Sequence, residues 1–226
     1  MAAQPETRER RAPRGRPRKL SHAAIVEAAI AFLDERPLEE FTLARLARRL
    51  GAGTMSLYTY FPSRDALLDA VADRVFELFA LPAPEERWQD SLLAWLRAWR
   101  QHFERYPVAR KILAWDGHVA PAWMRITAPV VVLLRAQGLS GRRLANAYQW
   151  FITASIGLLL SQQYTRAIRW RRDPNELAPL DPESAAAIQD LWAHEVELAP
   201  DAALEFGFRH LIAGVEAHVR GDAGAS

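Results

Sequence analysis

A glycine turn at residues 51–53 constrains the fold of this chain more than any other feature of its sequence. Before the turn, residues 42–50 carry apolar side chains at helical spacing, and Gly51 is the residue type that most readily takes the left-handed conformation that ends helices. After the turn, residues 54–60 form a second short segment, which ends where Phe61-Pro62 disfavours helical backbone. The sequence therefore predicts two short helices joined by a tight turn.

Two further helices are expected around this pair. Ser21 can cap a helix over residues 21–35, in which apolar side chains recur three and four positions apart until a proline stops it. Thr42 can cap the second helix in the same way, and Ser63 can cap a fourth. Three short helices, with the second and third joined by a glycine turn, describe a helix-turn-helix.

The helix expected over residues 54–60 carries more polar and aromatic groups than a small core can absorb. Leu57 and Phe61 can turn inward, whereas the remaining hydroxyl, aromatic and methionine side chains cannot all be buried. Hydroxyl groups donate hydrogen bonds to phosphates, and Thr54 or Met55 can touch a thymine methyl in the major groove. We therefore interpret this helix as an outward-facing DNA reader.

Residues 41–51 read FTLARLARRLG and residues 56–68 read SLYTYFPSRDALL. Over residues 21–70 the chain resembles the DNA-binding domain of TetR-type repressors. The resemblance implies phosphate contacts from Thr42, Tyr58, Tyr60 and Arg64. It implies that base edges face Thr54, Met55, Ser56 and Thr59. The family often has serine and lysine where this chain has Gly53 and Thr54, so the operator sequence is not predicted.

Each of these residues also has an interpretation within the protein itself. Tyr58 or Tyr60 can complete the core of the small domain. The arginines at positions 45, 48 and 49 fit a solvated helix face. Arg64, by contrast, opposes the helix dipole at the start of its helix, so we attribute its position to a phosphate partner.

Residues 1–20 form a basic arm with seven Arg and Lys against two Glu, although the net charge of the whole chain is only +2. Its sequence Arg14-Gly15-Arg16-Pro17-Arg18-Lys19 resembles the core of an AT-hook. Such an extended strip can lie in a narrow minor groove, with Arg14, Arg16, Arg18 and Lys19 as the contacts. The alternative is a disordered, solvated tail.

The rest of the chain is expected to be helical and rich in aromatic side chains, with helices over 63–79, 88–106, 108–115, 121–138, 140–168, 182–198 and 201–219. An apolar wall with a few polar groups is typical of a small-molecule site. The candidate ligand-binding residues are Trp95, Trp99, His102, Phe103, Trp115, Trp123, Asn146, Gln149, Trp150 and Thr153. The competing interpretation is that the aromatic stripe is plain core and that the histidines are surface groups.

A homodimer is expected because one helix-turn-helix contacts few base pairs. Two of them, related by a twofold axis, can grip major grooves about 34–36 Å apart. By the resemblance, residues 140–168 and 201–219 of two subunits form a four-helix interface.

Several classes of function are excluded or disfavoured by what the sequence lacks. It has no cysteine, which excludes disulfides and thiolate chemistry. It carries no nucleophile, metal or phosphate-loop motif, so we expect no enzyme, no metal and no cofactor. It has no apolar run of membrane-spanning length and no secretory signal, so a cytoplasmic protein is expected, with no membrane partner.

We therefore predict an all-α protein with a basic arm over 1–20, a helix-turn-helix domain over 21–68 and a ligand-binding and dimerisation domain over 69–221. Its predicted function is a repressor that binds a palindromic operator as a homodimer. A small hydrophobic or aromatic effector would release it by moving the fourth helix. The alternatives are a constitutive or architectural DNA-binding protein and a helical module that binds no nucleic acid.

Overall fold

The computed structural model describes residues 20–113, 121–167, 174–195 and 199–221. These residues form helices with no strand among them, which confirms the all-α prediction. The α-helices are α1 (His22–Glu35), α2 (Leu43–Leu50), α3 (Thr54–Tyr58), α4 (Arg64–Glu77), α5 (Trp88–Arg105), α6 (Val108–Leu113), α7 (Pro121–Ala136), α8 (Gly141–Ala167), α9 (Pro182–Glu195) and α10 (Pro200–Arg220). Short 3-10 helices follow α1 and α8, at Leu38–Glu40 and Pro174–Leu177. The candidate DNA contacts Arg14, Arg16, Arg18 and Lys19 and the candidate ligand residue Trp115 lie outside the described residues.

Side-chain caps begin three of the first four helices, as the sequence predicts. The hydroxyls of Ser21, Thr42 and Ser63 each accept a hydrogen bond from the amide three residues on, at 3.2, 3.2 and 3.0 Å. Gly51 ends α2 in the left-handed conformation with φ of 65°. Local chemistry therefore sets the outline of the N-terminal part of the fold.

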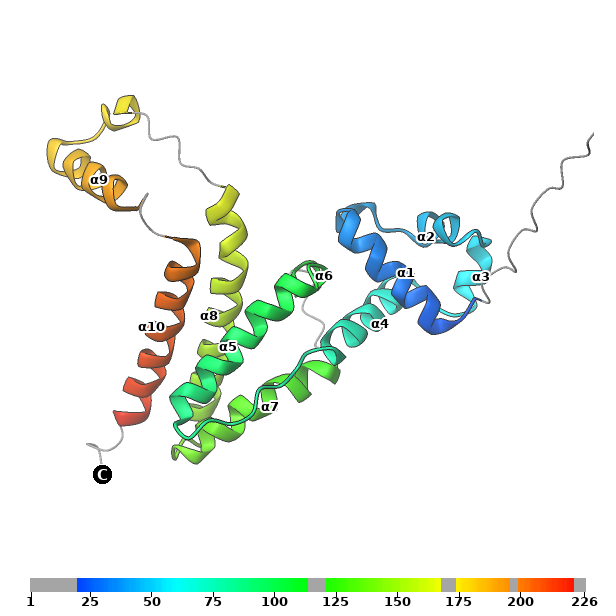
Figure 1. Ribbon diagram of the computed structural model, residues 1–226, viewed down its shortest axis with the longest axis horizontal. Coiled ribbons are helices and arrows are strands. Elements are labelled where there is room, and N and C mark those ends of the chain that lie inside the picture. Colours follow the sequence, from blue (N-terminus) through cyan, green and yellow to red (C-terminus); the bar gives the residue numbers. More distant parts are fainter. Residues whose placement is uncertain (1–19, 114–120, 168–173, 196–198, 222–226) are drawn as a thin grey trace, which may run out of the picture.

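The helices α1, α2 and α3 form a small head at one end of the molecule (Figure 1). Its core includes Leu33, Leu46 and Leu57, each with no exposed surface. The helix α3 is two residues shorter than predicted, because the amides of both Tyr60 and Phe61 bond to the Leu57 carbonyl in a closing turn.

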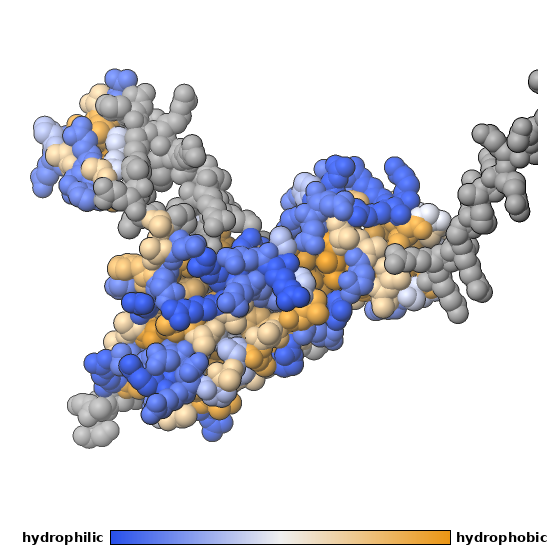
Figure 2. Space-filling view, viewed as in Figure 1, coloured by the Kyte–Doolittle hydropathy of each residue, from blue (hydrophilic) through white to orange (hydrophobic). Residues whose placement is uncertain are grey.

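The body consists of α5 to α10 (Figure 1). The helices α8 and α10 run side by side in opposite directions, and α5 packs against both. The helix α9 stands away from the other helices of the body, between the end of α8 and the start of α10. Polar side chains cover much of the visible face, with apolar residues between them (Figure 2).

The helix α4 belongs to both parts of the molecule. Along its length it packs against α1 in the head and against α6 and α7 in the body. One continuous hydrophobic cluster accordingly runs from Ile25 in the head through Val75 of α4 to Val215 in the body. A movement of α4 would therefore change packing contacts both in the head and in the body.

Candidate nucleic-acid interface and ligand site

The exposed side of α3 is the candidate DNA-reading face. Leu57 is fully buried and anchors the helix, whereas 78% of Met55 and 45% of Tyr58 is exposed. Ser56 and Thr59 are also exposed, and Thr54 is half-buried at the first turn. The structure thus brings the five candidate residues of α3 and its C-cap to one outward-facing helix, and their contacts with DNA stay a prediction.

Tyr60 differs from Tyr58 in having a partner inside the protein. Its hydroxyl donates a hydrogen bond of 2.9 Å to the carbonyl of Leu20, just before α1. The sequence left a structural role inside the small domain open for Tyr58 or Tyr60, and Tyr60 is the one that has it. Its hydroxyl keeps an acceptor site and partial exposure, so a phosphate contact through Tyr60 requires this bond to loosen or be shared.

Arg64 is held by the head itself. Its Nε donates to the Phe41 carbonyl at 3.0 Å and one of its terminal nitrogens to the Leu38 carbonyl at 3.1 Å, while the side chain also lies 3.5 Å from Asp65. The dipole argument that attributed its position to a phosphate was therefore wrong, because these carbonyls explain the position. A phosphate contact by Arg64 now rests on the family resemblance alone.

The arginines of α2 mostly face acidic partners within the head. Arg45 bonds Glu40 at 2.7 Å, and Arg49 makes two bonds of 2.6 Å to Glu35. The bonds from Arg49 lower the pKa of Glu35. Thr42 is exposed beside them, and because its oxygen only accepts in the cap, its hydroxyl proton can still be donated to a phosphate.

The second candidate site is an aromatic cluster at the meeting point of α4, α5 and α7. Its members are Trp95, Trp99, His102 and Phe103 of α5, Phe76 and Phe79 at and just beyond the end of α4, and Trp123 of α7. Trp99 lies at the centre, with ring centroids 4.7 Å from Phe79, 5.6 Å from Trp123 and 5.9 Å from Phe76. These are ordinary packing distances for aromatic pairs. The cluster is a packed core in this structure, and the described residues leave a cavity of about 10 Å³ beside Trp99 and Trp123.

Three ring nitrogens in this cluster differ in whether they form a hydrogen bond. The Trp95 indole donates a 2.9 Å hydrogen bond to the Ile126 carbonyl. Neither Trp99 Nε1 nor His102 Nε2 has a hydrogen-bond partner among the described residues, although both are buried. Burial lowers the pKa of His102 to about 4, so its ring is neutral near pH 7.

Four candidate ligand residues on α8 do not face this cluster. Asn146, Gln149, Trp150 and Thr153 are exposed, and the prediction that they line the centre of the body is wrong. The buried side of α8 carries Ala147, Phe151, Ser155 and Leu159, which recur four positions apart. The four candidates lie on a different side of the helix for that reason.

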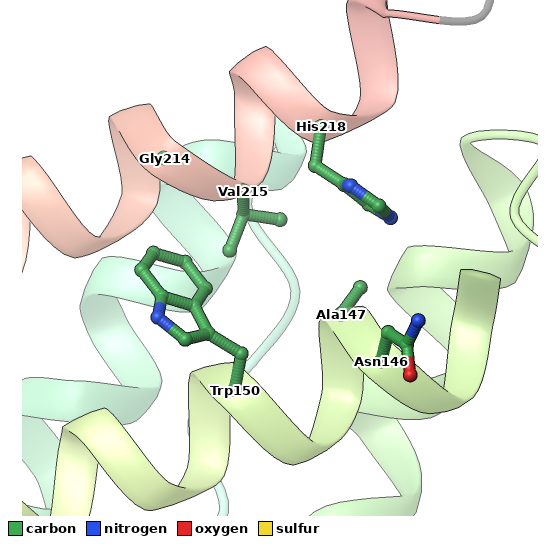
Figure 3. Close-up of a pocket in the computed structure, with 6 residues that line it drawn as sticks. All are labelled: Asn146, Ala147, Trp150, Gly214, Val215 and His218. Atoms are coloured by element: carbon green, nitrogen blue, oxygen red, sulfur yellow. The ribbon is translucent and has the colours of Figure 1, made fainter. Parts of the chain in front are cut away.

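Two of these residues, Asn146 and Trp150, instead line a surface hollow between α8 and α10. Trp150 reaches across beside Gly214 and Val215, while His218 points back toward Asn146 (Figure 3). The hollow between them measures about 280 Å³. A Cβ atom on Gly214 would lie 2.5 Å from the Trp150 ring, so the indole can lie there only because position 214 is glycine. We call the exposed residues of α8 and α10, among them Asn146, Gln149, Trp150, Thr153 and the strongly exposed Phe206, the outer face.

An apolar crevice between the α4–α5 connection and α7 was not predicted. It measures about 140 Å³ and is lined by residues 81–84, Pro129, Val130 and Leu133, with Trp95 on its inner side. The prolines at positions 82, 84 and 129 were the available signal, since a helix with an internal proline bends and opens a gap against its neighbour.

The sequence also did not predict the polar contacts that α7 makes with α4 and that α6 makes with α1. Arg125 of α7 donates to the carbonyls of Phe76 and Glu77 at 2.9 and 3.2 Å, which satisfies the C-terminal end of α4. The Val108 amide of α6 bonds Asp34 of α1 at 3.0 Å. No spacing in the sequence identifies an arginine that bonds the carbonyl end of another helix.

Within the part of the chain that the structure describes, no helix is both long enough and apolar enough to cross a membrane.

Two family models match the chain and together cover most of it. The family described as "Bacterial regulatory proteins, tetR family" matches residues 25–71, which contain α2 and α3. The family described as "Tetracyclin repressor-like, C-terminal domain" matches residues 81–219, which is more than half of the chain.

Relatives and solved structures agree with these matches. The class C tetracycline repressor of Escherichia coli is 28% identical over 201 residues, covering 88% of this chain and 91% of that protein. The transcriptional repressor DrrR1 of Streptomyces coeruleorubidus is 32% identical over 157 residues, covering 69% of this chain and 58% of that protein. Apo ActR of Streptomyces coelicolor superposes with a TM-score of 0.75 at 28% identity, covering 91% of this chain and 98% of that chain. The protein therefore belongs to the tetR family of bacterial regulatory proteins, the helix-turn-helix transcriptional repressors that bind operator DNA and respond to small ligands.

Proposed function

We propose that this regulator binds a palindromic operator as a homodimer and releases it when a small hydrophobic or aromatic effector enters the aromatic cluster. The observation that carries the proposal is the course of α4. It packs on α1 in the head, and Phe76 near its end and Phe79 just beyond it lie directly on Trp99. An effector that separates rings around Trp99 therefore acts on the helix that holds the DNA reader.

The exposed side of α3 supports the assignment of DNA contacts. The proposed contacts within the head are Thr42, Thr54, Met55, Ser56, Tyr58, Thr59, Tyr60 and Arg64. The basic arm over residues 1–20 would add a second, sequence-tolerant contact in the minor groove. Since operator DNA in bacteria lies in the cytoplasm, that is where the protein would act.

The outer face supports the dimer. Trp150 and Phe206 expose 47% and 64% of their surface there, which is costly for large apolar side chains in a lone subunit. A second copy of the chain, packed through α8 and α10, would cover both. Two readers on one rigid dimer then match a palindromic site.

The aromatic cluster supports an aromatic effector. A planar aromatic compound can replace the ring contacts that Trp99 makes with Trp123 and Phe76. Similar proteins point the same way: ActR has been solved in complex with actinorhodin, and several curated relatives are tetracycline repressors. By role, we propose domain boundaries at residues 20, 68 and 221, with α4 continuing across the second of them.

The signal to DNA would pass through α4 with help from α7. Arg125 fixes α7 to the carbonyl end of α4, and the Ala122 amide bonds Asp73 at 3.4 Å. If an effector displaces Trp123, both contacts move with α7. The helix α4 then turns relative to α1, and the spacing of the two readers departs from the operator spacing.

The test uses the full-length protein and fragments of its own genome. We expect selective enrichment of a palindromic fragment, a dimeric mass in light scattering, and release of the fragment by at least one member of a panel of aromatic compounds. Tyr58→Ala should lose the fragment and keep the dimeric mass. Binding that no compound weakens, even one that raises the melting temperature, would favour the constitutive DNA-binding alternative. A folded monomer that retains no fragment would contradict the proposal as a whole.

A further inference from the structure

Two polar atoms in the aromatic cluster lack the partner that buried polar atoms require. Trp99 and His102 are 2% and 5% exposed, and they lie one turn apart on α5 with ring centroids separated by 5.7 Å. Trp99 Nε1 and His102 Nε2 have no hydrogen-bond partner within the part of the chain that the structure describes. Unpaired buried polar atoms are uncommon in folded proteins and call for an explanation.

Apolar packing alone does not explain them. Phenylalanine fills the same kind of position elsewhere in the cluster without adding a polar atom, as Phe76, Phe79 and Phe103 do. One turn before Trp99 on the same helix, Trp95 shows that an indole here can be satisfied, since it bonds the Ile126 carbonyl. Among the described residues, one buried indole thus has an internal partner, whereas its neighbour has none and can bond a guest.

The chemistry of the two atoms limits what can pair with them. An indole N–H only donates, so its partner must be an acceptor such as a carbonyl oxygen. The ring of His102 is neutral near pH 7, because burial lowers its pKa to about 4. A neutral imidazole nitrogen either donates or accepts according to its tautomer, and a hydroxyl group can meet either requirement. The surrounding rings fit flat aromatic compounds without a formal charge, which would be costly to bury here.

We propose that Trp99 Nε1 and His102 Nε2 select the effector, by pairing with a ring carbonyl and a hydroxyl of an uncharged, planar aromatic compound. The inference rests on the proposed function and specifies the chemical class of its ligand. The cavity that the described residues leave beside Trp99 measures about 10 Å³, so the compound must displace a ring of the cluster. Trp123 is the ring that moves, since it is only half-buried and lies 5.6 Å from Trp99.

The experiment compares three probes of the same fused-ring shape: anthracene, anthraquinone and 2-hydroxyanthraquinone. Binding to the full-length protein is measured by quenching of tryptophan fluorescence, at a pH below the pKa of the phenol. We expect anthraquinone to bind about fivefold more tightly than anthracene, and the hydroxyl to add about another fivefold, as neutral hydrogen bonds typically do. Equal affinities for all three probes would overturn the inference without any variant.

Three matched variants test which residue causes each of the two increases in affinity. Trp99→Phe should abolish the preference for anthraquinone over anthracene, and His102→Phe should abolish only the gain from the hydroxyl. Trp95→Phe removes the same volume and also an indole, but that indole already has a partner, so both preferences should persist. If Trp99→Phe retains the carbonyl preference, the assignment of Trp99 is wrong, and the same holds for His102 and the hydroxyl. Should Trp99→Phe fail to fold, the wild-type series together with His102→Phe decides.

Melting temperatures without any probe give a second measure. Phenylalanine at position 102 removes an unpaired polar atom, so His102→Phe should melt at the wild-type temperature or above it. Trp95→Phe should melt lower than Trp99→Phe, because only the first loses an internal hydrogen bond. The reverse order would show that Trp99 has a partner in the folded protein and would overturn the inference.

The outcomes also separate this inference from the proposed function. If wild-type protein is released from its genomic fragment by an aromatic compound, yet the variants discriminate the probes as wild type does, only the effector chemistry is wrong. If the probes are discriminated as expected but never change DNA binding, the pocket chemistry stands and the effector-driven release is wrong.

Discussion

The head and the aromatic cluster use polar side chains in opposite ways. In the head, hydroxyls and arginines cap helices, bond acidic side chains or backbone carbonyls, or remain exposed. In the cluster, two polar atoms are buried without a partner among the described residues. Under the proposed function, the DNA-reading surface keeps its polar groups hydrated until DNA binds, whereas the buried effector site holds its polar groups away from water.

The largest effect should come from removing the centre of the cluster. Trp99→Ala deletes a ring that contacts six other rings of the cluster, so we expect it to lower the free energy of unfolding by about 3–5 kcal/mol. Met55→Ala, on the exposed side of α3, should change it by less than about 0.5 kcal/mol. Urea denaturation of both variants measures the contrast. Equal losses would show that α3 is part of the core rather than a free reader.

The second effect concerns pH and is specific to the cluster. His102 takes a proton near pH 6.5 when unfolded but only near pH 4 when folded. The unfolded state therefore binds more protons between these values, so stability should be intact above pH 6.5 and fall by up to about 3 kcal/mol as pH drops toward 4. His102→Phe should flatten this part of the curve, measured by urea denaturation across pH. An unchanged slope would mean that His102 is solvated in the folded protein.

A third prediction separates two tyrosines of the head. Tyr58→Phe removes a hydroxyl from the exposed side of α3, so it should weaken operator binding about tenfold and leave stability unchanged. Tyr60→Phe removes the bond to the Leu20 carbonyl and should cost about 1 kcal/mol of stability. Gel shifts and thermal melts report the two effects. If Tyr58→Phe alone melts lower, the roles of the tyrosines are reversed.

The smallest effect compares helix starts in the two regions. Ser63 caps α4 through its hydroxyl, so Ser63→Ala should destabilise the protein by about 1 kcal/mol. Arg87 holds the equivalent position before α5 without a side-chain cap bond, and Arg87→Ala should have almost no effect. Chemical denaturation of both variants tests the pair. A comparable loss at Arg87 would contradict the view that side-chain caps matter mainly in the head.

The head could be predicted from sequence because local rules govern it. Ser21, Thr42, Gly51 and Ser63 each act on backbone within a few residues, and their roles were confirmed. Arg64 was misjudged because its carbonyl partners at positions 38 and 41 lie more than twenty residues away. No local pattern reports such a contact.

The body was harder because its patterns are ambiguous. Trp150 and Phe151 are adjacent and both large, so the spacing on α8 does not decide which one faces inward. Phe151 does, and Trp150 with its polar neighbours lies on the outer face. Trp95 and Trp99 are likewise the same residue type one turn apart. Only the folded position of the Ile126 carbonyl distinguishes the satisfied indole from the unsatisfied one.

Because α4 packs against both the head and the body, it limits how hybrids of such regulators can be built. A cut after residue 68 would strip the head of Val71 and Val75, which are fully buried. Even a graft that keeps all of α4 and the two residues after it would place Phe76 and Phe79 against a foreign body that was not shaped to receive them. A functional hybrid therefore has to transplant the end of α4 together with the tryptophans that it contacts. Under the proposed function, the hybrid then inherits the effector site and its connection to the DNA reader together.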